Sequence, residues 1–105
     1  MVKFITKDMF EQEDEYKIAC KIQQRRLQIL IHSYIYYELN DNIISDDKWS
    51  SFAKELCILQ KSFPDIAKKV PYDKVFKDFD GSTGMNLKYD KWIKEKAKFI
   101  LSYKK

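Results

Sequence analysis

The feature that most constrains this chain is a short polar break between two runs of helical periodicity. Positions 40–42 read Asn-Asp-Asn, residues whose short side chains bond their own backbone and favour turns. After the break, apolar side chains recur at spacings of three and four, at Trp49, Phe52, Ala53, Leu56, Leu59 and Phe63. Ser45 is the predicted N-cap of this second run, and Asp46 and Asp47 lie in its first turn, where carboxylates stabilise the helix dipole. The pattern predicts two antiparallel helices joined by a tight turn.

The first arm of this hairpin, from about residue 14, has apolar residues on two sides. One side comprises Tyr16, Ala19, Cys20, Leu27, Leu30, Ile31, Tyr34 and Tyr37, and the other comprises Ile18, Ile22, Ile29 and Tyr36. A helix that is apolar on two sides usually lies at the centre of its domain. Residues 23–26 (Gln-Gln-Arg-Arg) interrupt the pattern. We expect a solvated turn there, from which Arg25 and Arg26 could contact phosphate.

The remainder of the chain predicts a loop and one more helix. The second arm should end at or before Phe63, because the residue before Pro64 is driven out of the α region. Both glycines fall in an irregular loop at 72–87, with a tight turn at Asp80-Gly81. From about residue 88 to 103, one face is again apolar, at Tyr89, Trp92, Ile93, Ala97, Ile100 and Leu101. Residues 1–6 fit a brief strand or an irregular arm, and Thr6 or Asp8 is expected to cap the following helix.

These elements predict an all-α fold of three or four helices. The chain has 105 residues, two glycines, two prolines and a hydrophobic fraction of 45%, which suits one domain of long helices with a core. We expect a single domain over 1–105, made of a hairpin at about 14–64, a loop at 65–87 and a C-terminal helix at about 88–103.

Composition also restricts the classes of partner and compartment. The net charge of +4 is compatible with an anionic partner without requiring one. Cys20 and Cys57 lie at or beside apolar stripes, which predicts buried or half-buried free thiols in a reducing cytoplasm. Neither a signal peptide nor an apolar run of about 20 residues is present, so no membrane association is expected.

No set of residues in the sequence has the spacing of a catalytic or metal site. Lys77 and Asp80-Gly81 resemble the nucleotidyl-transfer motif K-x-D-G, but here two residues separate the lysine from the aspartate, where the motif has one. In an extended segment the extra residue places the lysine on the opposite side from the aspartate. His32, the single histidine, has no evident nucleophile or orienting partner. The run from Gly81 to Gly84 lacks the lysine of a P-loop. We therefore predict that the protein is not an enzyme.

A family resemblance is carried by the residues around the turn. They are Tyr34-x-Tyr36-Tyr37, Ile44-Ser45-Asp46, an aromatic residue at 49, Glu55-Leu56 and Pro64. This arrangement resembles the small N-terminal domain, domain Ia, of NAD-dependent DNA ligases, whose pattern is roughly YxYYxxD, ISDxEYDxLxxEL and then a proline. The resemblance covers about residues 27–64. The whole sequence, with DFDGSTG at 78–84, also resembles small uncharacterised bacteriophage proteins.

The resemblance implies a helical hairpin that closes over the nicotinamide mononucleotide (NMN) half of NAD during self-adenylation. The residues carried over as cofactor-binding are Tyr36, Tyr37, Asp46 and Trp49. Two positions depart from the family pattern. Trp49 stands in place of tyrosine, which keeps a stacking face and moves the polar group, and Ser50 stands in place of an aspartate that could pair with a ribose or a cationic ring.

Three hypotheses for function follow. In the first, a non-catalytic phage-type accessory protein uses the hairpin and the basic C-terminal helix to bind a host protein of replication, repair or defence. The predicted partner-binding residues are Tyr34, Tyr36, Trp49, Arg25 and Arg26, and a homodimer is also compatible with the sequence. Adjacent helical positions are 100° apart, so at least one of Tyr36 and Tyr37 should be exposed. In the second hypothesis, the hairpin binds NAD or NMN. In the third, Arg25, Arg26 and the C-terminal lysines bind nucleic acid.

Overall fold

The computed structural model describes residues 4–84 and 87–104. Its elements are a 3₁₀ turn, η1 (Lys7–Met9), and the helices α1 (Glu13–Tyr37), α2 (Asp46–Ser62), α3 (Pro64–Ala67) and α4 (Lys91–Lys104). No strand occurs within those described ranges, so the all-α prediction is confirmed. The sequence suggested a brief strand or an irregular arm at residues 1–6. Residues 4–6 are irregular, and residues 1–3 lie outside the described residues.

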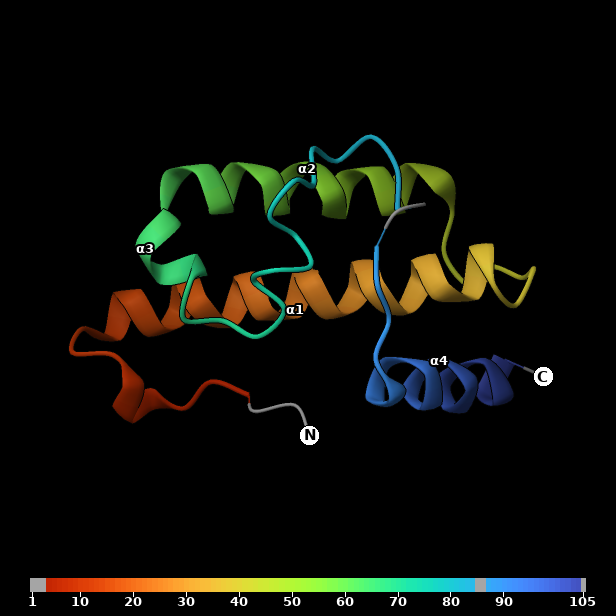
Figure 1. Cartoon of the computed structure of the whole chain (residues 1–105), viewed down its shortest axis with the longest axis horizontal. Coiled ribbons are helices and arrows are strands. Elements are labelled where there is room, and N and C mark those ends of the chain that lie inside the picture. Colours follow the sequence, from red (N-terminus) through yellow and green to blue (C-terminus); the bar gives the residue numbers. More distant parts are fainter. Residues whose placement is uncertain (1–3, 85–86, 105) are drawn as a thin grey trace.

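Helix α1 is the axis of the domain (Figure 1), and the other helices pack around it. Helix α2 runs along one side of α1, and α4 lies on the opposite side. The fully buried side chains of α1 include Ala19, Ile22, Ile29, Leu30 and Ile35, which pack in one core with Ala53 and Leu56 of α2 and with Ile93 and Ala97 of α4. Burial of each large aliphatic side chain contributes about 1.5–3 kcal/mol. The two apolar sides of α1 therefore have the partners that the sequence pattern predicts.

The ends of the hairpin helices follow local sequence chemistry. Ser45 caps α2 as predicted, because its Oγ accepts a hydrogen bond from the backbone N–H of Lys48 at 3.1 Å. Helix α2 ends at Ser62, and Phe63 leaves the helical region immediately before Pro64. At the turn, Asn40 adopts a left-handed conformation with φ of 52°, a conformation that asparagine tolerates. Both ends of the predicted turn are thus set by short polar side chains.

One predicted helix cap and one predicted helix start differ from the structure. Thr6 precedes only the short turn η1, and α1 begins at Glu13 behind Gln12, whose side chain makes no capping hydrogen bond. Helix α4 begins at Lys91, three residues after the predicted start at 88. The reason is Asp90, whose Oδ1 accepts a hydrogen bond from the backbone N–H of Ile93 at 2.9 Å and so acts as the N-cap.

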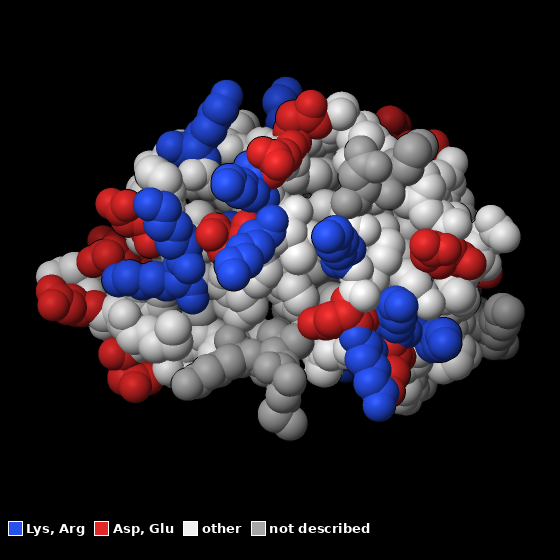
Figure 2. All heavy atoms as spheres, in the orientation of Figure 1, with Lys and Arg blue, Asp and Glu red and all other residues white. Residues whose placement is uncertain are grey.

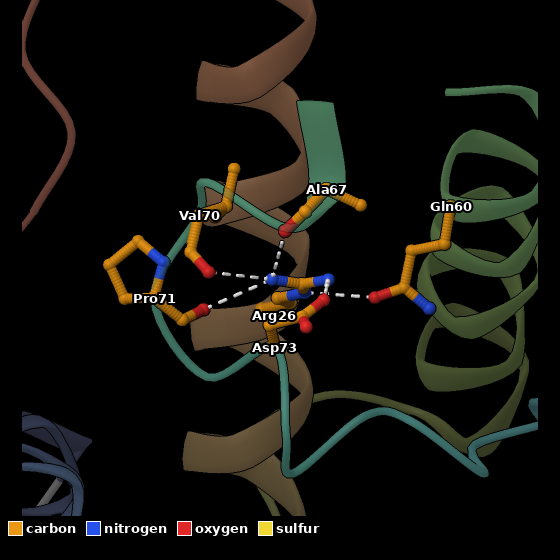
Figure 3. Close-up of polar contacts among 6 residues, drawn as sticks. All are labelled: Arg26, Gln60, Ala67, Val70, Pro71 and Asp73. Atoms are coloured by element: carbon orange, nitrogen blue, oxygen red, sulfur yellow. Dashed lines mark hydrogen bonds and ion pairs between the residues drawn. The ribbon is translucent and has the colours of Figure 1, made fainter. Parts of the chain in front are cut away.

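The prediction of a solvated turn at 23–26 is wrong for Arg26. Its side chain is 1% exposed, in the middle of the face of α1 that meets the segment after α3. Figure 3 shows its guanidinium enclosed by that segment, with Gln60 of α2 beside it. Nη1 donates to the carbonyl oxygens of Ala67, Val70 and Pro71, at 3.1, 2.9 and 3.2 Å. A polar residue in α1 thus organises a segment more than forty residues further along the chain.

The remaining nitrogens of the Arg26 guanidinium are also paired. Nε donates to Oε1 of Gln60 at 2.8 Å, and Nη2 is 3.3 Å from Oδ1 of Asp73. Burial lowers the pKa of Arg26 to about 10, partly offset by the nearby Asp73 carboxylate, so the group remains cationic at neutral pH. A buried cation with a full set of acceptors holds those acceptors in place, which explains why residues 67–73 keep one shape with little regular secondary structure.

The structure also bears on the cysteines, on metal-binding side chains and on membrane-spanning helices. Cys20 and Cys57 are free, half-buried thiols, as predicted. In the part of the chain that the structure describes, no cluster of three or more metal-ligating side chains occurs. None of the helices within the described residues has the length and hydropathy that a bilayer crossing requires.

Candidate functional site at the hairpin tip

A cavity of about 220 Å³ lies at the tip of the hairpin, where α1 ends and α2 begins. Helix α1 contributes His32, Ser33, Tyr36 and Tyr37 to its wall, and the turn and α2 contribute residues 42–46, Trp49 and Ser50. Ser82, from the loop before α4, completes the lining. The four residues carried over as cofactor-binding from the resemblance, Tyr36, Tyr37, Asp46 and Trp49, all line this one cavity.

The tyrosine pair forms the exposed side of the cavity. Tyr36 is 53% exposed and Tyr37 is 37% exposed, so the prediction that at least one of the two rings faces solvent is confirmed. The rings meet edge to face with centroids 4.9 Å apart. The hydroxyl of Tyr37 is 3.0 Å from Oγ1 of Thr83 and forms a hydrogen bond with it. Tyr37 is thereby tied to the loop, whereas Tyr36 keeps a broad accessible surface.

Trp49 lines the cavity from α2 and is held from several sides. Its Nε1 donates a hydrogen bond to Oγ of Ser33, which is buried on α1, at 3.0 Å. Its ring meets Phe79 edge to face at 6.3 Å. Gly84 is buried against both Ser33 and Trp49, and a Cβ atom at that position would lie 2.9 Å from Ser33 Cβ and 3.2 Å from Trp49 Cζ2. The polar group of the tryptophan therefore points into the protein.

The remaining predicted surface residues are not part of this cavity. Tyr34 is 8% exposed and packs edge to face on Tyr89 at 5.2 Å, so its ring belongs to the core and is not presented at the surface. Arg25 is half-buried, with its guanidinium 4.4 Å from the Phe52 ring centroid and 3.3 Å from Glu55. Arg26 is buried, as described above. The tip thus retains Tyr36 and Trp49 from the predicted partner-binding set.

The electrostatics of the cavity combine one carboxylate with a neutral histidine. Asp46 lies at the first position of α2, next to the capping Ser45. His32 is half-buried, and its Nδ1 is buried without a hydrogen-bond partner among the described residues. Burial lowers the pKa of His32 below its usual 6.5, so the imidazole is uncharged at neutral pH. A cation entering the cavity would meet Asp46 without repulsion from His32.

Acidification should destabilise the protein through His32. Between its folded-state pKa and 6.5, the unfolded chain binds more protons than the folded one, so the free energy of unfolding falls as pH is lowered through 6.5. The slope owed to one such group is at most about 1.4 kcal/mol per pH unit. Urea unfolding between pH 7.5 and 5 should therefore show a loss of stability that His32→Gln largely removes. Equal pH dependence in the two proteins would contradict this assignment.

Sequence reasoning missed the loop side of the cavity. The run 78–84 suggested a turn, but nothing in it indicated that Ser82 would line a cavity, that Thr83 would hold Tyr37, or that Gly84 would be buried against Trp49. Ser33 was also missed, although a small polar residue inside an apolar stripe of α1 is a recognisable sign of a buried hydrogen bond. The contacts of the loop with α1 and α2 join residues about 35 to 50 positions apart, and the Ser33–Trp49 hydrogen bond joins residues 16 apart.

Comparison with known proteins finds similarity to DNA ligases. The chain is 36% identical over 53 residues to a DNA ligase of Thermosipho africanus, which covers 50% of this chain and 8% of the ligase. It is 39% identical over 49 residues to a DNA ligase of Pseudothermotoga lettingae, covering 47% of this chain and 7% of the ligase. No protein-family model and no solved structure matches the chain. About half of this protein is therefore similar to a small part of DNA ligases.

Proposed function

We propose that this protein is a non-catalytic binding module whose hairpin-tip cavity holds the nicotinamide ring of NMN or NAD. The observation that carries the proposal is that Tyr36, Tyr37, Asp46 and Trp49, identified from the ligase resemblance, line one cavity. The similarity to ligase segments adds weight to that resemblance. Binding without catalysis is proposed because the sequence offers no nucleophile with an adjacent base.

The size of the cavity suits a single ring. Pockets that enclose a whole drug-sized ligand have volumes of roughly 300–1,000 Å³. At about 220 Å³, this cavity is smaller, so the ribose and phosphate of NMN would extend beyond it. The exposed face of Tyr36 adjoins the cavity and offers a stacking surface for a flat ring.

The charges in the cavity favour a cationic ring. Oxidised nicotinamide carries a positive charge, and aromatic faces attract such a ring with about 0.5–2 kcal/mol. Asp46 supplies an anionic group at the wall, and the neutral state of His32 avoids repulsion. Ser50 lines the same cavity at the position where the ligase pattern has aspartate, so this cavity has one carboxylate fewer than that pattern implies. Replacing Ser50 with aspartate tests how much that charge contributes to binding.

Calorimetric titration with NMN tests this proposal. The wild-type protein should bind NMN more tightly than AMP, which has a similar phosphate but an uncharged ring. Tyr36→Ser should weaken NMN binding about 2- to 30-fold, because one stacking face is lost. Ser50→Asp should strengthen it about two- to fivefold, since a partly exposed ion pair is gained. Tyr103→Ser, at an exposed tyrosine outside the cavity, is the matched control and should bind normally.

A protein partner at the tip is the second candidate, favoured by the exposure of Tyr36. In this case a host protein of replication, repair or defence would cover the ring, and the module would act as a phage-type accessory factor. The same variants separate the two functions. If NMN produces no heat at millimolar concentration while a lysate protein is captured by the wild type and not by Tyr36→Ser, the partner function replaces the nucleotide function.

A further inference from the structure

Helix α4 carries the entire excess of positive charge in the protein. It contains five lysines and one glutamate, a net charge of +4, and the other 91 residues hold fifteen basic and fifteen acidic residues. On the face shown in Figure 2, a group of basic side chains with acidic side chains among them lies where Figure 1 places α4, and basic and acidic side chains are also intermingled over the rest of that face. By residue count, this excess of positive charge lies outside the stretch at 27–64 that resembles the ligases.

The same helix carries a row of three aromatic rings, of which Phe99 and Tyr103 are exposed and Trp92 is half-buried against Phe4. Trp92, Lys96, Phe99 and Tyr103 follow one another at helical spacing, away from the buried Ile93 and Ala97. Phe99 is 53% exposed and Tyr103 is 78% exposed, and the two rings meet edge to face at 5.1 Å. The Lys96 ammonium lies 5.9 Å from the Trp92 ring centroid and 5.4 Å from that of Phe99. One lysine therefore lies between two of the three rings along this line.

A second row, of lysines, runs beside the rings. Lys91, Lys94 and Lys98 recur at spacings of three and four and are exposed, and consecutive residues such as Lys98 and Phe99 point about 100° apart around the helix. Lys91 is partly neutralised by Glu95 at 3.9 Å. Within the part of the chain that the structure describes, Lys94, Lys96 and Lys98 form no ion pair. From Trp92 to Tyr103 the rows span about 16 Å, roughly the length of four or five nucleotides at 3.4 Å each.

We propose that this surface of α4 binds single-stranded nucleic acid, with phosphates along the lysine row and bases stacked on Phe99 and Tyr103. A positively charged track with accessible aromatic faces is the combination that recognises single strands without sequence preference. Two other occupants fit less well. A second copy would oppose one +4 helix with another. A bilayer would need an apolar face, but the apolar face of α4 is already buried against α1, and Lys96 lies within the ring row.

Fluorescence anisotropy with a labelled 15-nucleotide oligo-dT tests the proposal. The wild-type protein should bind saturably in 50 mM NaCl and much more weakly in 200 mM NaCl. Phe99→Ser with Tyr103→Ser should weaken binding at least tenfold, because stacking is lost. Lys94→Gln with Lys98→Gln should reduce the slope of log K against log salt by about 1.4. Tyr36→Ser, in the hairpin cavity, should bind the oligonucleotide normally, which separates this surface from the proposed nucleotide site.

Three results would overturn the proposal. One is the absence of saturable binding at 50 mM NaCl. Another is a double ring variant that binds as tightly as the wild type, which would leave only non-specific charge attraction. The third is ring-dependent binding to phosphatidylserine vesicles in place of the oligonucleotide. Since the four substituted side chains are exposed, each variant should keep the wild-type melting temperature, and this is checked by circular dichroism.

Discussion

Arg26→Met should lower the free energy of unfolding by about 3–5 kcal/mol. Methionine fills much of the space of the arginine stem but offers no donor. The carbonyl oxygens of Ala67, Val70 and Pro71 would lose the guanidinium that they share, and Asp73 would lose its ion pair. The Ala67 carbonyl would keep the hydrogen bond from the backbone N–H of Val70. A buried acceptor left without a donor costs about 1–3 kcal/mol, and partial hydration of the opened segment would recover part of that loss.

The neighbouring Arg25 provides the control for this measurement. It has the same side chain on the same helix, but it is half-buried and pairs with the partly exposed Glu55. Arg25→Met should therefore cost no more than about 1 kcal/mol. Urea unfolding followed by circular dichroism measures both variants. Equal losses in the two would show that the buried network around Arg26 does not organise residues 67–73.

Gly84→Ala should destabilise the protein by about 1–3 kcal/mol and disturb the cavity. An added methyl group would overlap the Ser33 hydroxyl and come within 3.2 Å of the Trp49 ring, at the point where these two side chains are hydrogen-bonded. The loop or the tryptophan would have to move. Because Trp49 forms one wall of the cavity, the variant should also bind NMN more weakly than the wild type.

A double-mutant cycle tests the cause of that loss. Ser33→Ala by itself removes one hydrogen bond and should cost about 1 kcal/mol. In the Ser33→Ala background the closest contact of the new methyl group is absent, so Gly84→Ala should cost less there than in the wild type. If the two substitutions were additive, the overlap with Ser33 would not be the source of the instability.

The sequence predicted those parts of the fold that depend on local chemistry. The turn at 40–42, the Ser45 cap and the end of α2 before Pro64 each rest on a short stretch of chain, and each is found in the structure. The burial of Arg26 was missed because Gln23 and Gln24 beside it make the segment look solvated. Three of its five acceptors are backbone carbonyls, which leave no trace in residue type, and the side chains of Gln60 and Asp73 lie more than thirty residues away in the sequence.

For the site, sequence resemblance identified the residues and the structure showed how they differ. Tyr34 and Tyr36 are two positions apart and so lie on different sides of α1, one in the core and one exposed. Sequence pattern by itself did not distinguish them, because both sides of this helix carry apolar residues. Gly84 shapes the cavity wall through its close contact with Ser33 of α1, about 50 residues away in the sequence. A contact at that distance along the chain cannot be read from local sequence.

The central claim, that the hairpin-tip cavity binds the nicotinamide ring, is tested most directly by an NMR titration of ¹⁵N-labelled protein with NMN. The two tryptophans give two indole N–H signals, one from Trp49 in the cavity and one from Trp92 on α4, which does not line it. The Trp49 signal should shift progressively and saturate, together with the backbone signals of Tyr36 and Tyr37, while the Trp92 signal stays in place. If NMN at millimolar concentration leaves the Trp49 signal unmoved, or moves both indole signals equally, the claim is contradicted.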